Sequence, residues 1–515
     1  MNQKETDILI IGSGPVGATF ARVIHDALPG KKILMIDAGP RLTANAGMHV
    51  KNIADEKERE LAQIKSQGPH QKPYPLVTVA ERATAVQEGR INLDLLARPG
   101  THLISETETE LRNNGLPAAA YSTNIGGMGA HWTCACPRPG NAEKIPFIPD
   151  DEYEEAFSRA EELLYVTQHA FPESAEGMAI QKILGGLFNP QLSKDRKVQP
   201  MPVACKLDES GNQYWVGPDI ILGNLSQPGN KEGLEIWPET ICWKLETADG
   251  EISKALVEEI KTKERTAIKA KIYILACDAF RTPQLLWASG IRPKALGHYL
   301  NEHPFVFAFV ELADKLVDKS SGPEYNPAGR KDQTIGVFWV PFDSPGHQFH
   351  AQIMHMDLSP LKIETHGNPK HIVGLGWGCV KEIRFDDHIE FSETEKDFFG
   401  MPKMNIRFSL TERDLAEIET AKQMQRKALN AFGKEIREGQ QTLMPSGTSL
   451  HTQGTVRMGE QDDGESVCNS YGRVWGYDNL FVGGNGVIPM ATTSNPTLTS
   501  VAMAVRSAGK IVSLL

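Results

Sequence analysis

The first 40 residues alternate between short apolar runs and a helical pattern. "DILIIGSG" is an apolar run that ends in a glycine turn, and small and aliphatic residues then recur at helical spacing until Pro29-Gly30 stops the pattern. "KILMID" is a second apolar run, and it ends on an acid. A strand, a helix and a second strand in this order form a βαβ unit, which predicts the start of a parallel, doubly wound sheet.

The hydrophobic pattern changes twice further along the chain. An acidic amphipathic helix is predicted over residues 151–165, and β-like segments from about 235 to 275 lead into the apolar strand "KIYILACDA". From roughly 291 to 445, runs rich in β-branched and aromatic residues predict a mostly antiparallel sheet, followed by one long amphipathic helix. The C-terminal segment returns to an α/β pattern, with a strand and glycine turn in "NLFVGGNGVIP" and then a terminal helix.

These patterns predict an α/β protein with two domains, which a chain of 515 residues also favours. The first is a Rossmann-like nucleotide-binding domain that is discontinuous in sequence, because the C-terminal segment returns to it. The second is an inserted α+β domain, built on a largely antiparallel sheet and expected to face the substrate. We assign residues 1–140, 200–290 and 445–515 to the first domain, and residues 141–199 and 291–444 to the second.

Composition and charge argue against several classes of protein. The net charge of −11 disfavours nucleic acid as the main partner, since nucleic-acid-binding proteins present a basic face. No apolar run approaches the ~20 residues that span a membrane, and the N-terminus lacks the pattern of a secretory signal. The seven cysteines, with one close pair at Cys134 and Cys136, predict neither a disulfide framework nor a zinc site. We therefore expect a cytoplasmic protein that binds no metal, no nucleic acid and no membrane.

Three glycines in the first turn have the spacing of a dinucleotide-binding site. Gly12, Gly14 and Gly17 follow the first strand and open the first helix, where glycines permit a tight turn and a close approach of the backbone to a pyrophosphate. The helix N-terminus offers unpaired N–H groups to that anion. Asp37, at the end of the second strand, can accept hydrogen bonds from a ribose and disfavours NADP, whose 2′-phosphate it would repel. The glycines do not distinguish FAD from NAD, but the strand and turn near the C-terminus favour an enclosed flavin.

Two polar residues near the C-terminus are candidates for the chemistry. His451, in "SLHTQGTVRMG", is flanked by small and polar residues, and Asn495 precedes Pro496, which biases its backbone away from the helical region. Oxidation of an alcohol by a flavin needs a base for the hydroxyl proton, and histidine has a pKa near operating pH. A neighbouring amide can orient the hydroxyl without competing for that proton.

The stretch "GGMGAHWTCACPRP" places His131 after a glycine-rich turn and close to two cysteines. From the residues alone, His131 can be a metal ligand, a contact of a cofactor or a packed core residue. The metal interpretation is disfavoured because Cys134 and Cys136 are too close for the usual chelating pair and no second pair accompanies them.

Several motifs taken together resemble one family of flavoproteins. "GSGPVGA", "GGMGAHW", "ILACDAFRTPQLLWASG", "LHTQGTVRMG", "NLFVGGNGVIP" and "NPTLTSVAMAVRSA" are similar to motifs of the glucose–methanol–choline (GMC) FAD oxidoreductases. Within that family, "GGMGAHWTCACPRP" and the C-terminal motifs resemble the pyranose oxidases and their bacterial, glycoside-oxidising relatives. The resemblance covers both ends of the chain and the central strand, is weak over residues 291–390, and implies FAD as the cofactor of the first domain.

The resemblance also implies roles for individual residues. His451 and Asn495 match the active-site histidine and its asparagine partner, which face the reactive flavin nitrogen. His131 matches the histidine that pyranose oxidases join covalently to FAD. Gln352 matches a substrate-contacting glutamine, and Thr133 matches a threonine near the flavin edge that is also a substrate-binding candidate. The cofactor-binding residues implied in this way are Gly12, Gly14, Gly17, Asp37, Gly127, Met128, His131, Trp132, Thr133, Cys242, Ala276, Asn485 and Thr497.

The activity implied by the resemblance is oxidation of a secondary ring hydroxyl, at carbon 2 or carbon 3 of a pyranose sugar or an O- or C-glycoside, to a ketone. O2, giving H2O2, or a quinone would take the electrons. A GMC alcohol or polyol dehydrogenase and a non-redox lyase with flavin as a scaffold are the alternatives. The sequence departs from the pyranose-oxidase pattern just before His131, where it carries Gly-Ala in place of Ser-Thr, and its middle is shorter than in the fungal enzymes. We therefore expect a monomer or dimer rather than a tetramer.

Overall fold

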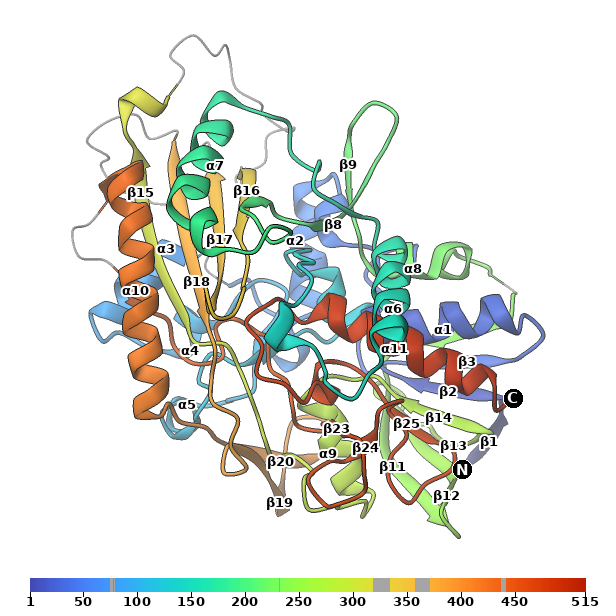
Figure 1. Ribbon diagram of the computed structural model, residues 1–515. Coiled ribbons are helices and arrows are strands. Elements are labelled where there is room, and N and C mark those ends of the chain that lie inside the picture. Colours follow the sequence, from blue (N-terminus) through green and yellow to red (C-terminus); the bar gives the residue numbers. More distant parts are fainter. Residues whose placement is uncertain (75–76, 78, 231, 318–333, 357–370, 437–440) are drawn as a thin grey trace.

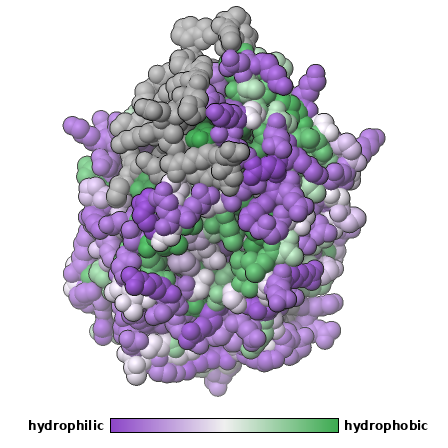
Figure 2. Space-filling view, turned by 90° about the vertical axis from the view of Figure 1, so that its left-hand side faces the viewer, coloured by the Kyte–Doolittle hydropathy of each residue, from purple (hydrophilic) through white to green (hydrophobic). Residues whose placement is uncertain are grey.

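Two sheets organise the molecule in the computed structural model (Figure 1), one at the lower right and one at the upper left of that view. The structure describes residues 1–515 except 75–76, 78, 231, 318–333, 357–370 and 437–440. Figure 2 shows the face on the left of Figure 1, where apolar residues gather near the centre of a mostly polar surface. Within the described residues, no helix is long and apolar enough to cross a membrane.

The first sheet is parallel and has five strands in the order β10-β3-β2-β14-β25. Four of its strands are buried along their whole length, because helices and loops cover both faces and every side chain of "ILII" or "IYIL" is therefore removed from water. This is the doubly wound sheet that the sequence predicts. The strands are β2 (Ile8–Ile11), β3 (Ile33–Ile36), β10 (Leu234–Trp237), β14 (Ile272–Leu275) and β25 (Leu480–Val482).

Helices from both ends of the chain pack together on this sheet. Helix α1 (Pro15–Ala27) contacts α11 (Thr497–Val512), and α11 contacts α6 (Asp150–Leu163), which is the acidic helix predicted over residues 151–165. The C-terminal segment therefore does return to the first sheet. The exact division of the chain into two domains stays a prediction.

The second sheet is largely antiparallel, in the order β21-β15-β18-β17-β16-β7 with β22 paired to β15. Helices α7 (Ala175–Phe188) and α10 (Glu412–Phe432) cover one face and share a core with it (Figure 1). The strands are β7 (Gln199–Pro200), β15 (Phe305–Leu312), β16 (Thr334–Val340), β17 (Phe349–Met356), β18 (Ile372–Cys379), β21 (Gly433–Glu435) and β22 (Thr442–Leu443).

A row of glycines in β18 shapes the other face of this sheet. Gly376 pairs with Gln352 of β17 on one side, and a Cβ added to Gly376 would lie 2.4 Å from the ring of Phe305. The phenyl ring can lie across β18 only because the glycine has no side chain. Gln352 stands opposite this glycine, so no β18 side chain covers it at that register.

The remaining elements include short helices, a separate four-stranded sheet and several smaller sheets. The helices are α2 (Glu56–Lys65), α3 (Val79–Gln87), α4 (Leu93–Leu96), α5 (Glu108–Asn113), α8 (Pro218–Leu222) and α9 (Arg281–Ala288). The strands are β1 (Asn2–Glu5), β4 (His102–Leu103), β5 (Ala120–Tyr121), β6 (Val166–Thr167), β8 (Val203–Leu207), β9 (Gln213–Trp215), β11 (Thr240–Ala248), β12 (Glu251–Glu259), β13 (Arg265–Lys269), β19 (His388–Lys396), β20 (Pro402–Arg407), β23 (Met458–Gly459) and β24 (Cys468–Asn469).

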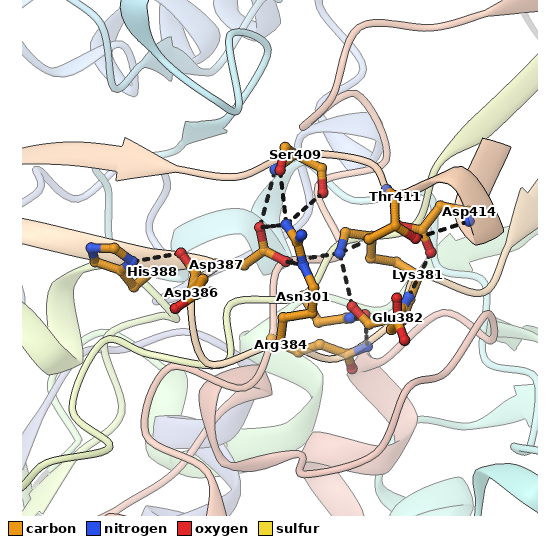
Figure 3. A network of polar contacts seen from close by, with 11 residues as sticks. Asn301, Lys381, Glu382, Arg384, Asp386, Asp387, His388, Ser409, Thr411 and Asp414 are labelled. Carbon is orange, nitrogen blue, oxygen red and sulfur yellow. Dashed lines mark hydrogen bonds and ion pairs between the residues drawn. The ribbon is translucent and has the colours of Figure 1, made fainter.

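A buried ionic network ties α10 to the segment before β15 (Figure 3). The Lys381 ammonium is fully buried and lies 2.8 Å from Asp387, 3.4 Å from Asp414 and 2.8 Å from the Glu382 carbonyl, so each of its three donors has an acceptor. Asp414 caps the first turn of α10. The Asn301 amide donates to the Lys381 carbonyl at 3.0 Å. The network therefore holds in place the segment that carries Glu302 and His303, which follow Asn301 directly.

Candidate active site

A cavity opens at the carboxyl ends of the parallel strands, where open α/β sheets bind their ligands. The turn after β2 contributes Gly12 and Gly14, the end of β3 contributes Asp37, and the end of β14 contributes Ala276. Residues from the distant C-terminal segment, including Asn485, complete the wall.

Each glycine of the first turn meets a different steric constraint. A Cβ on Gly12, which has φ 104°, would lie 2.3 Å from the Ala276 oxygen, and one on Gly17 would lie 2.0 Å from the Gly12 oxygen. A Cβ on Gly14 would meet only the Gly126 oxygen at 3.9 Å, and Gly14 lines the cavity. No side chain caps the first turn of α1 at Gly14, so an anion can serve as the cap. This cradle fits the pyrophosphate of FAD.

Asp37 is held firmly at the cavity wall. Its Oδ2 accepts hydrogen bonds from the Ser13 N–H at 3.0 Å and the Ser13 hydroxyl at 2.6 Å, and its Oδ1 accepts from the Gly39 N–H at 2.9 Å. Burial raises the pKa of Asp37, while these three hydrogen bonds oppose that rise. A carboxylate keeps further lone pairs beyond three such bonds, and these are available to a ribose hydroxyl.

Most of the residues implied as cofactor contacts line this one cavity. The exceptions are Gly17, which packs behind the turn, and His131 and Thr133. The roles of the lining residues stay predictions, but the fold brings them together from six separate stretches of chain. They are Gly12, Gly14, Asp37, Gly127, Met128, Trp132, Cys242, Ala276, Asn485 and Thr497.

His131 follows a short 3-10 helix, Gly127–Ala130, beside the cavity. Its Nε2 lies 2.9 Å from the Ser66 hydroxyl, and its Nδ1 is buried without a hydrogen-bond partner among the described residues. Burial lowers the pKa of His131 to about 4. Gly100 leaves the room for this ring, since a Cβ there would lie 2.4 Å from Nδ1. Thr133, two residues on, is exposed and lies outside the cavity wall.

The two cysteines after His131 take no part in a metal site among the described residues. Cys134 and Cys136 are buried and free, and burial raises the pKa of each thiol above its ordinary value. They pack in the main hydrophobic core.

Three of the four residues implied in catalysis or substrate binding form one cluster, which consists of His451, Asn495 and Gln352. The Asn495 Nδ2 lies 3.1 Å from the His451 Nε2, and the Gln352 Nε2 lies 2.5 Å from the Asn495 Oδ1. The residues on either side of His451, Leu450 and Thr452, line the cavity described above. The cluster therefore borders the nucleotide cavity, with Gln352 supplied by the antiparallel sheet.

The environment of His451 sets its protonation state. Burial, with a smaller contribution from the charge of Arg98, lowers the pKa of His451 to about 4. At neutral pH the ring is therefore uncharged and one of its nitrogens carries a lone pair, as a general base requires.

Sequence reasoning missed the residues that surround this cluster. His303 Nδ1 lies 3.0 Å from His451 Nδ1. The Ser449 hydroxyl accepts from the His451 N–H at 3.1 Å and itself bonds to the buried carboxyl group of Glu302, whose pKa burial raises to about 7. No local motif marks His303 or Glu302, because their role depends on contacts with residues almost 150 positions away.

A second missed carboxyl group fixes the loop before Asn495. Glu143 is 1% exposed. It accepts hydrogen bonds from the N–H groups of Thr493 and Ser494 at 2.5 and 3.1 Å and from their hydroxyls at 3.1 and 2.8 Å. These four hydrogen bonds hold the backbone immediately before Asn495.

Comparison with known proteins gives consistent results. Family models described as GMC oxidoreductase match residues 218–305 and 388–504. The chain is 41% identical to a C-glycoside 3-oxidase of Microbacterium trichothecenolyticum, over 98% of this chain and 96% of the relative. It is 28% identical to a pyranose 2-oxidase of Tricholoma matsutake, over 99% of this chain and 94% of the relative.

A solved structure shows the same fold at low sequence identity. A formate oxidase of Aspergillus oryzae RIB40 superposes with a TM-score of 0.64 at 14% identity, over 100% of this chain and 99% of that one. Together with the nucleotide cradle, these matches confirm the family and the fold expected from the sequence motifs. The chain belongs to the GMC oxidoreductase family and is an FAD oxidoreductase.

Proposed function

We propose that this enzyme oxidises a secondary ring hydroxyl of a glycoside, at carbon 3 of the pyranose, to the ketone. The observation that carries the proposal is the His451–Asn495 pair, 3.1 Å apart at the border of the nucleotide cavity. The similarity to a C-glycoside 3-oxidase favours carbon 3 over carbon 2 and a C-glycoside over a free sugar.

The chain's own residues supply the proton chemistry. His451 Nε2 would accept the hydroxyl proton, because burial keeps the ring neutral and because Nε2 faces the amide that can hold the hydroxyl oxygen. Asn495 would donate to that oxygen, and Gln352 would hold Asn495 and contact the sugar. FAD, when bound, supplies the hydride acceptor. O2, giving H2O2, or a quinone would then take both electrons.

The bond between His131 and FAD is a finer part of the proposal. The buried, uncharged ring with a free Nδ1 supports it, since a neutral imidazole nitrogen is a nucleophile. Acid precipitation of the holoprotein gives the result directly. Yellow colour that stays with the precipitate supports the bond, and colour that passes entirely into the supernatant refutes it.

Anaerobic flavin reduction tests the activity. The holoprotein would be mixed with a C-glucoside, an O-glucoside, glucose and an aliphatic alcohol, and the ketone would be located by NMR. We expect fastest bleaching with a C-glycoside and a carbonyl at carbon 3. Replacement of His451 by Ala should leave FAD binding intact and slow bleaching by about 10²-fold or more. Normal bleaching in that variant would refute the role of His451 as the base. Bleaching by the aliphatic alcohol alone would refute a glycoside as the substrate.

A further inference from the structure

We propose that His303 is a positioning residue for this oxidation, one that selects the tautomer of His451. In the productive arrangement, the His451 Nδ1–H donates to the His303 Nδ1, and the lone pair of Nε2 is left to accept the substrate proton. The inference rests on the proposed function, because it assigns a purpose to the Nε2 lone pair.

The geometry limits the two rings to a single shared proton. The Nδ1 atoms are 3.0 Å apart, and the rings meet edge to face with centroids 4.9 Å apart and an interplanar angle of 69°. His303 is 1% exposed and stands just before β15. Burial, followed by the neighbouring rings of His451 and His350, holds the pKa of His303 well below its usual range. Both rings are therefore neutral, and one Nδ1 donates while the other accepts.

The far side of His303 can complete this arrangement. Its Nε2 lies 3.2 Å from the Thr492 hydroxyl and 3.3 Å from the Gln453 amide nitrogen. When His303 Nδ1 accepts, its proton sits on Nε2, and the Thr492 oxygen can receive it. No carboxylate hydrogen-bonds to either ring in the part of the chain that the structure describes. The partner of the His451 Nδ1 is thus the uncharged ring of His303, whose Nδ1 can either accept or donate a hydrogen bond.

The amide of Asn495 supports the same tautomer. Its Oδ1 faces Gln352 and its Nδ2 faces the His451 Nε2, and in this orientation of the amide Nε2 is the accepting nitrogen. His451 then carries its one proton on Nδ1, directed at His303. A proton on the His451 Nδ1 thus satisfies both the contact with His303 and the contact with Asn495.

One chain of contacts pulls toward the opposite tautomer. The Trp339 indole N–H can only donate, and it donates to the His350 Nδ1 at 2.9 Å. The proton of neutral His350 is therefore on Nε2, 2.9 Å from the Gln352 amide, where an amide oxygen would satisfy it better than the nitrogen. Reversal of the Gln352 and Asn495 amides would relieve this conflict and place the His451 proton on Nε2. Without His303 as the acceptor for the His451 Nδ1–H, this inactive tautomer of His451 would be the more stable one.

The test compares two substitutions of His303 with one control. His303→Asn keeps a polar atom near the position of Nδ1 that can accept, whereas His303→Leu removes every acceptor. His355→Leu is the control, because His355 is also buried in the antiparallel sheet but contacts His371 rather than the cluster. Each holoprotein would be reduced anaerobically with a C-glucoside, giving the limiting rate of flavin reduction and the Kd of the sugar.

We expect His303→Leu to slow flavin reduction by about 10²-fold, the lower range of general base catalysis, with the Kd of the sugar little changed. His303→Asn should recover a large part of that rate, and His355→Leu should match the wild type. Equal rates in His303→Leu and the wild type would overturn the proposal. Equally slow reduction in both His303 variants, with FAD bound in each, would show a structural role instead and would also overturn it.

A second readout does not depend on turnover. In protein labelled with 15N-histidine, the His451 signals are identified by their loss in His451→Ala, and their shifts report which nitrogen carries the proton. We expect the proton on Nδ1 in the wild type and on Nε2 in His303→Leu. Lack of flavin reduction by any glycoside in the wild type would defeat the proposed function alone, whereas an unchanged tautomer in His303→Leu would defeat the assignment of His303.

Discussion

Glu143 offers the sharpest test of how the catalytic loop is held. Substitution by Ala removes the acceptor of four hydrogen bonds from Thr493 and Ser494, and of a fifth from the Gly140 N–H at 2.6 Å. The side chain is 1% exposed, so these donors would be left in a site closed to water. A buried donor without a partner costs about 1–3 kcal/mol, and partial relaxation limits the total to about 3–5 kcal/mol.

The same substitution should affect catalysis, because the loop leads directly into Asn495. A displacement of about 1 Å in a reacting group can cost about 10²-fold in rate, so we expect Glu143→Ala to slow flavin reduction by between about tenfold and 10²-fold. Glu143→Gln keeps one oxygen acceptor and should lie between Ala and the wild type in both properties. Glu155→Ala, on the exposed side of α6, is the control and should change neither.

Urea unfolding monitored by tryptophan fluorescence gives the stability of each variant, and stopped-flow bleaching gives the rate. If Glu143→Ala bleached at the wild-type rate while its unfolding midpoint fell, the carboxyl group would stabilise the fold without placing Asn495. If neither quantity changed, the reasoning from buried hydrogen bonds would be wrong for this site.

Three further predictions concern the cofactor, the ionic network and pH. Gly14→Ala should fold but bind FAD weakly, because its Cβ enters the cavity. Gly17→Ala should instead lower the melting temperature, because its Cβ would lie 2.0 Å from a backbone oxygen. Equal FAD content in Gly14→Ala and the wild type would contradict the first expectation. Lys381→Met should cost about 3–5 kcal/mol in urea unfolding, because the buried Asp414 loses its ion pair and the buried Asp387 keeps only its pair with Arg384. Lys261→Met, at an exposed pair, should leave the unfolding midpoint unchanged, and matching midpoints for the two variants would refute the reasoning. The pKa of His451 is lowered to about 4, so the limiting rate of flavin reduction should stay level from pH 8 to near pH 5. Below pH 5 the rate should fall, because the ring gains a proton and can no longer act as the base. A fall in rate centred near pH 6.5 would contradict this expectation.

Local sequence determined the two sheets and the nucleotide cradle. Apolar runs such as "ILII" bury on both faces only in a parallel sheet covered by helices, and the first glycine turn tolerates no Cβ at Gly12 or Gly17. The apolar runs and the glycine spacing can be read from a single chain, whereas the steric reason for Gly12 is the oxygen of Ala276, which only the packed sheet brings close. The motifs around His451 and Asn495 belong to the same class of signal.

Tertiary structure alone decided what surrounds His451. His303 meets His451 across 148 positions, and Glu143 reaches the loop before Asn495 across 350. Nothing in the neighbouring sequence distinguishes His303 from the other histidines, since its role comes from the register of β15 and the packing of two sheets against one loop. Periodicity determines which face of an element is buried, whereas a hydrogen bond between distant side chains is fixed only when those elements pack. The sequence by itself therefore predicted the fold and proposed His451 and Asn495 for the chemistry, and only packing decided which side chains contact His451.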